Sequence, residues 1–157
     1  MATLLFMRNA IVSLKVSAGA AVQFQGQVST ASLEVEAGDV VTYPVLDGTV
    51  PSNVGPESYA LHLVAAQDWT AATGLAAFLW TNAGQDASFW VNAYGAATAA
   101  ADKPAMAGTC RLVAGTYGGE VQTYAELDVT LPCLVKPTLT ITGPAPTEEE
   151  AAEEGAA

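Results

Sequence analysis

The chain has 157 residues, of which 51% are hydrophobic and 13% are charged, and its formal net charge is −11. This length suggests one domain with enough chain to bury a core. Five basic residues against sixteen acidic ones cannot neutralise many phosphates, so binding of nucleic acid or of an anionic membrane is not expected. No run approaches the roughly 20 apolar residues of a membrane span, and the N-terminus lacks the basic start of a signal peptide, which predicts a cytoplasmic protein.

Alternation of apolar and polar residues predicts strands through most of the chain. The strand-like runs are, in chain order, residues 9–16, 31–38, 39–46, 58–67, 86–95, 105–115 and 121–131. The clearest is the last, in which the odd-numbered residues from Val121 to Leu131 form a dry face and the even-numbered residues a wet one. About eight strands separated by turn residues predict a mainly β protein, a β-sandwich or barrel with one flanking helix.

Two other runs have faces that can be assigned. In residues 9–16, Leu14 and its apolar neighbours two residues away are expected to point inward, and Ser13 to point outward. In residues 31–38, Val35 is expected to lie on the inner face and the two glutamates beside it on the outer face.

The predicted helix runs from about Ala71 to Ala83, with Asp68 and Thr70 as candidate N-caps and Gly84 placed to end it. Three apolar side chains form its expected packing face: Leu75, Phe78 and Leu79. Such a short helix needs a sheet beneath it to be stable.

Two segments stand outside the strand pattern. Residues 46–57, LDGTVPSNVGPE, form a long connection with two Gly and two Pro, which is too long for a simple hairpin turn. Residues 143–157, GPAPTEEEAAEEGAA, are predicted to be a flexible acidic tail that follows a single domain of residues 1–142.

The sequence contains no recognisable catalytic motif. His62 is the one histidine, and no pair of cysteines at short spacing accompanies it as metal ligands. There is no G-x-S-x-G and no phosphate-binding loop. We therefore expect neither an enzyme nor a cofactor, and we expect Cys110 and Cys133 to be free, buried thiols.

In the order and spacing of these segments, the chain resembles the major tail protein, or tail tube protein, of long-tailed bacteriophages, particularly those of actinobacterial hosts. The resemblance extends from about Leu5 to Leu139. It is carried by SYALHLVAAQDW (58–69), GLAAFLWTNAG (74–84) leading into DASFWV, MAGTCRLVAGTYGGEVQTYAELDV (106–129) and LPCLVKPTL (131–139). The acidic tail is not part of the shared pattern.

The resemblance implies a structural virion protein that forms rings, usually hexameric, which stack into a tube for genome passage. Each subunit would be a β-sandwich with one flanking helix. Its partners would be further copies of itself and other tail proteins, such as the tape measure and terminator proteins. Genome DNA would pass through without specific binding, no membrane would be involved, and the protein would be located in the virion tail after assembly in the host cytoplasm.

The resemblance also suggests roles for particular residues. Acidic side chains that line the bore would repel phosphates, and the candidates are Glu34, Glu36, Glu126 and Asp128. The long connection would reach the adjacent ring and become ordered only on stacking, and its candidate contact residues are Thr49, Val50, Pro51, Ser52, Asn53, Val54 and Gly55.

Two alternatives remain open at this point. One is a phage capsid decoration or head–tail joining protein, which would also be β-rich and dependent on assembly. The other is a non-viral β-sandwich binding module, such as a surface adhesin domain.

Overall fold

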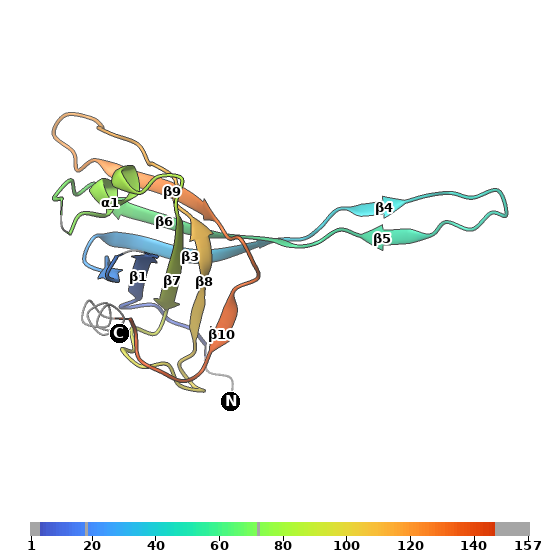
Figure 1. Cartoon of the computed structure of the whole chain (residues 1–157), viewed down its shortest axis with the longest axis horizontal. Helices are drawn as coiled ribbons and strands as arrows, with labels where there is room; N and C mark the ends of the chain where they lie inside the picture. Colours follow the sequence, from blue (N-terminus) through green and yellow to red (C-terminus); the bar gives the residue numbers. More distant parts are fainter. Residues whose placement is uncertain (1–3, 18, 72, 147–157) are drawn as a thin grey trace.

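The computed structural model describes residues 4–17, 19–71 and 73–146 (Figure 1). Within these ranges the chain forms ten strands and one helix, and every pair of neighbouring strands is antiparallel. The prediction of a mainly β protein, a β-sandwich with one flanking helix, is confirmed.

Two sheets form the body of the protein. The large sheet contains, in spatial order, β10 (Thr138–Thr140), β8 (Ala105–Arg111), β7 (Asp86–Asn92), β1 (Ile11–Val16) and β2 (Val22–Gln23). The small sheet contains β3 (Val28–Glu36), β6 (Ser58–Ala66) and β9 (Glu126–Pro132). A third pair, β4 (Val40–Thr42) and β5 (Ser52–Val54), lies away from the body.

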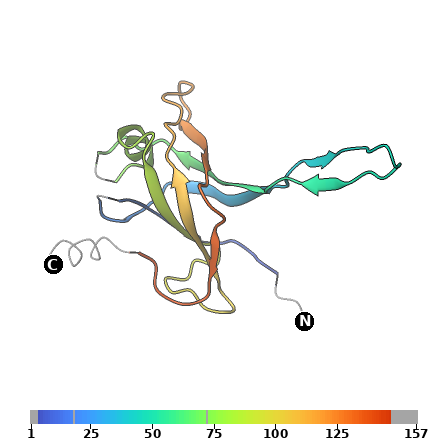
Figure 2. The same cartoon turned by 45° about the vertical axis from the view of Figure 1, so that its right-hand side comes forward.

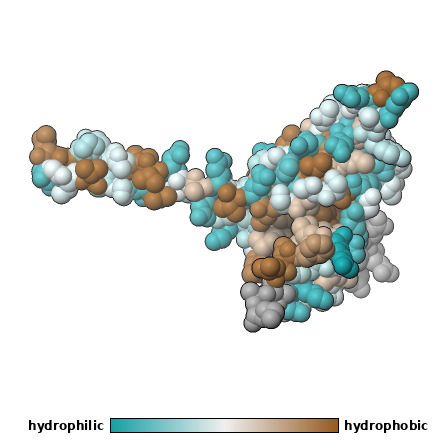
Figure 3. Space-filling view, turned by 180° about the vertical axis from the view of Figure 1, so that it is seen from behind, coloured by the Kyte–Doolittle hydropathy of each residue, from teal (hydrophilic) through white to brown (hydrophobic). Residues whose placement is uncertain are grey.

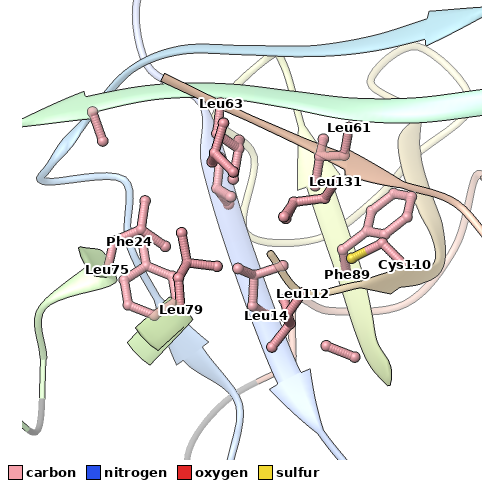
Figure 4. Close-up of a cluster of buried hydrophobic side chains, with 14 of the residues drawn as sticks. Leu14, Phe24, Leu61, Leu63, Leu75, Leu79, Phe89, Cys110, Leu112 and Leu131 are labelled. Atoms are coloured by element: carbon pink, nitrogen blue, oxygen red, sulfur yellow. The ribbon is translucent and has the colours of Figure 1, made fainter. Parts of the chain in front are cut away.

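The main core lies between the two sheets. Leu61 and Leu131 of the small sheet face Leu14 and Phe89 of the large sheet, and all four side chains are buried (Figure 4). In β9, Leu127, Val129 and Leu131 are buried while the residues between them are exposed, as the alternation predicted.

The outer face of the large sheet carries a second, smaller core, which the sequence did not indicate. Trp90, Ala99, Ala105 and Ala145 are buried there together. This cover explains why Ser13 is buried, contrary to the expectation that it points to solvent. Val35 is exposed rather than buried because it lies near the end of β3, where the chain leaves the body.

The C-terminal boundary predicted at residue 142 is wrong. Ala145 is buried, its amide donates to the Ala97 carbonyl at 2.7 Å, and the Ala99 amide donates to the Gly143 carbonyl at 2.8 Å. The packed body therefore continues to residue 146. The rest of the predicted acidic tail, residues 147–157, lies outside the described residues.

The clearest predicted strand is shorter than expected. β9 begins at Glu126, opposite Ala66, and one further bond, from the Gln67 amide to the Ala125 carbonyl at 2.9 Å, ends its pairing with this part of the chain. Val121 and Tyr124 are instead exposed in a loop, and Gln122 has a positive φ of 69° that is incompatible with a strand.

The helix α1 (Leu75–Thr81) is also shorter than the predicted span from Ala71 to Ala83. Neither Asp68 nor Thr70 is its N-cap. Asp68 instead accepts a hydrogen bond from the Thr70 amide at 2.9 Å, within the turn that precedes the helix. Gly74 is the N-cap residue, and a Cβ there would lie 2.2 Å from the Asp68 carbonyl oxygen.

The first turn of α1 is capped by a side chain from a distant part of the sequence. Gln27 Oε1 accepts the Leu75 amide at 2.8 Å, and Gln27 Nε2 donates to the Thr73 carbonyl at 2.6 Å. At the other end, Asn82 is the C-cap residue, and Gly84, which was predicted to end the helix, lies two residues beyond it with a positive φ of 84°. The helix start thus depends on a tertiary contact.

The predicted packing face of α1 is buried in large part. Leu75 and Leu79 are completely buried in the main core, whereas Phe78 is half-buried with its ring centroid 5.3 Å from that of Phe24. The helix therefore closes one end of the space between the sheets.

Candidate assembly surfaces

The most distinctive surface is the arm, which we define as residues 37–57. It contains β4 and β5 and extends far from the body in both views (Figure 1 and Figure 2). The expectation that residues 46–57 have no regular structure in a single chain is wrong. They form the tip and the returning strand of a β-hairpin in which Val40 pairs with Val54 and Thr42 with Ser52.

The tip of the arm has specific turn chemistry. The Asp47 carboxylate accepts hydrogen bonds from the Thr49 hydroxyl at 2.7 Å and the Thr49 amide at 2.8 Å. These two bonds lower the pKa of Asp47, so the acceptor remains charged at neutral pH. Gly48 has a positive φ of 86° and donates its amide to the Val45 carbonyl. The turn is therefore locally satisfied without help from the body.

The two limbs of the arm come very close together at its base. A Cβ at Gly38 would lie 2.0 Å from the Gly55 carbonyl oxygen, so only glycine fits there without displacing the backbone. The Gly55 amide donates to the Asp39 carbonyl at 2.9 Å. This contact sets where the arm leaves the body.

The arm is rich in apolar side chains that none of the described residues covers. All residues from 39 to 54 are exposed. The large apolar residues among them are Val40, Val41, Tyr43, Val45, Leu46, Val50 and Val54. Figure 3 shows hydrophobic residues along the whole length of the arm. Of the predicted contact residues, Thr49 to Pro51 lie on the returning limb, Ser52 to Val54 form β5, and Gly55 lies at the base.

The outer face of the small sheet is acidic. The register places Ser32 opposite His62 and His62 opposite Thr130, so even-numbered residues of all three strands share this face. The four acidic residues predicted as two separate pairs lie on it together: Glu34, Glu36, Glu126 and Asp128. The sequence has no Lys or Arg from residue 16 to residue 102, and none in β9.

His62 lies between two of these carboxylates. Its Nε2 is 2.7 Å from Asp128 Oδ1, and its Nδ1 is 3.6 Å from Glu34 Oε1. The side chains of Glu34 and Asp128 are 57% and 70% exposed, against 24% for His62. The histidine therefore links the outer faces of three neighbouring strands and leaves both acids open to solvent.

The small sheet also has two open edges. Neither β3 nor β9 is followed by a further strand of that sheet among the described residues. Unpaired edge strands readily accept a strand from another chain, and β3 is a long one with nine residues. These edges are therefore available to a strand of another chain.

An apolar cleft of about 260 Å³ opens between the sheets beneath the N-terminal segment. Leu5 and Met7 line one side, and Leu33, Phe89 and Met106 are among the residues that line the rest. The cleft is large enough for one or two aliphatic side chains. Its lining is a second place where apolar surface is available to another chain.

An aromatic cluster near the helix was missed at the sequence level. The ring of Trp69 lies 5.0 Å from that of Tyr117 and 6.2 Å from that of Trp80. Gln67 holds this arrangement, because its side chain bonds both the amide and the carbonyl of Gly118 and accepts from Trp69 Nε1. The aromatic residues lie in segments that the pattern of strands did not connect, so no local signal joined them.

In the part of the chain that the structure describes, no three His, Cys, Asp or Glu side chains gather closely enough to hold a metal ion. No helix among the described residues is long and apolar enough to cross a membrane. Neither a scan of protein-family models nor a search of curated proteins finds a match to this chain.

Proposed function

We propose that this chain is a phage tail tube protein, a structural subunit that forms rings and stacks them into a tube. The single observation that carries the proposal is the arm, an ordered hairpin with seven large apolar residues that stay exposed among residues 4–17, 19–71 and 73–146. Apolar surface of this extent favours contact with another protein. A second copy of the chain is the partner that the resemblance to tail tube proteins favours.

The geometry of the arm suits stacking. A contact between the arm of one subunit and the body of another is heterologous, because different surfaces meet. Heterologous contacts that close form rings, and contacts that do not close build open tubes. Edge pairing by β3 and β9 would supply the ring contact, and the arm would supply the contact between rings.

The acidic face supports a role in genome passage. Four carboxylates without a neighbouring Lys or Arg in their strands give this face a negative potential. Lining the bore with such a face would repel phosphates over about a Debye length, roughly 8 Å at physiological salt. DNA could then pass without binding to the wall.

The proposal is tested by making the arm polar without changing its shape. Val40, Val41 and Val54 are replaced by Thr, which has nearly the same shape and the same preference for strands. Burying one methyl group contributes about 0.8 kcal/mol, so the three changes are expected to raise the concentration needed for tube formation by roughly 50-fold or more. Sedimentation across a concentration series measures this threshold.

The matched control changes polar positions of the same two strands, with Thr42→Ser, Ser52→Thr and Asn53→Ser. Its threshold should stay within about threefold of the parent chain. Equal thresholds for both triple variants would show that the apolar side chains of the arm do not drive assembly. A parent chain that never sediments by itself would favour a decoration protein or a monomeric binding module.

A further inference from the structure

Cys110 and Cys133 lie opposite each other where the two sheets meet. Cys110 is in β8 of the large sheet, and Cys133 follows β9 of the small sheet. The two residues form an isolated antiparallel bridge. The Leu134 amide donates to the Thr109 carbonyl at 2.9 Å, a bond that flanks the cysteine pair rather than joining it. The cysteines therefore occupy a non-hydrogen-bonded position, where facing side chains come closest.

The side chains of both cysteines point to the same side. Cys110 is completely buried in the main core beside Phe89 (Figure 4), and Cys133 packs against that core from a half-buried position. In such pairs the Cα atoms are typically about 4.5 Å apart, which falls within the range of about 4.4 to 6.8 Å seen for disulfides. Both residues are free thiols in this structure, although the backbone already presents them as a pair.

We propose that Cys110 and Cys133 are a modification site, a thiol pair that a small-molecule disulfide of the oxidised glutathione class converts to a disulfide between the two sheets. Cys133 reacts first because it is the partly exposed residue. Its thiolate attacks one sulfur of the reagent, which breaks the reagent's S–S bond and releases one thiolate. The Cys110 thiolate then attacks the Cys133 sulfur and releases the second thiolate. The two protons lost by the cysteines end on the two released thiols.

The surroundings of the pair make this reaction slow at neutral pH. Burial raises the pKa of Cys110 to about 12, and burial also raises the pKa of Cys133. Thiolate is the attacking species, so the rate should increase with pH. A reducing cytoplasm keeps both thiols free. The disulfide forms once the chain meets an oxidising environment, whether or not the protein assembles into tubes.

The test exposes the full chain to a series of oxidised-to-reduced glutathione ratios, at pH 8.5, in buffer and in urea. After an acid quench, alkylation and mass spectrometry count the free thiols. We expect the folded chain to lose two hydrogen atoms without cross-linking to another chain. The equilibrium constant for disulfide formation should be on the order of 100-fold larger for the folded chain than for the unfolded chain, because folding holds the two ends of the loop together. The thermal midpoint should rise on the order of 10 °C on oxidation.

The Cys133→Ala variant is the control, because it removes the half-buried partner and keeps the buried one. It should show no such loss of hydrogen and no rise in the midpoint. A folded parent chain that keeps both thiols at ratios that oxidise the unfolded chain would overturn the proposal. Disulfide formation only between chains would do the same. Neither outcome bears on tube formation, which is measured separately.

Discussion

Replacing residues 40–54 with Asn-Gly is expected to abolish tube formation and to leave a folded body. The Gly55 amide already donates to the Asp39 carbonyl at 2.9 Å, which is the bond that closes a two-residue hairpin. Asn-Gly favours the type I′ turn that such a hairpin needs. All removed residues are exposed, so the excision takes nothing from either core. Negative-stain microscopy shows whether tubes form, and a cooperative thermal unfolding transition shows whether the body is folded.

The control for this excision keeps the arm at full length and replaces its seven apolar residues with Thr or Ser. If the apolar contacts of the arm, rather than its length, drive assembly, this chain should also fail to form tubes. Its unfolding midpoint should match that of the excised chain. Tubes of normal diameter from the excised chain would mean that the arm is dispensable. Loss of the folded body would instead mean that the arm stabilises β3 and β6.

Leu79→Ala is expected to lower the free energy of unfolding by about 2 to 5 kcal/mol, the usual cost of emptying a buried leucine site. Leu79 is completely buried and lies on the helix that closes one end of the main core. Urea denaturation of the unassembled chain measures the change. Thr81→Ala, an exposed position on the same helix, should stay within about 0.5 kcal/mol of the parent. A loss below 1 kcal/mol for Leu79→Ala would show that the helix is not part of the folding core.

Much of the body could be predicted because its strands have one dry face and one wet face. The alternation in β9 identified Leu127, Val129 and Leu131 as core and Glu126 and Asp128 as surface, and the structure agrees. Spacing along the helix likewise identified Leu75 and Leu79. The spacing of apolar residues predicts these positions correctly, because burial of a single face of a strand or helix is what produces that spacing.

The features that were not predicted from the sequence depend on contacts between residues that are distant in the sequence. The arm was divided into a strand and a structureless connection, because the pairing of Val40 with Val54 cannot be recognised from either limb alone. Gln27 caps a helix that begins at Leu75, and no local rule connects the two. Residues 121–124 alternate like a strand, but they form a turn in which Gln122 has a positive φ of 69°. The two acidic pairs share one face only because β6 lies between their strands.

A reconstruction of the assembled full chain by electron cryomicroscopy tests the central proposal most directly. We predict a hollow tube of stacked rings, with the arm of each subunit packed on the adjacent ring and the face that carries Glu34 and Asp128 turned toward the bore. A chain that stays monomeric at concentrations far above those of the other assays would contradict the proposal. So would a tube in which the arm is free and the acidic face lies on the outer wall.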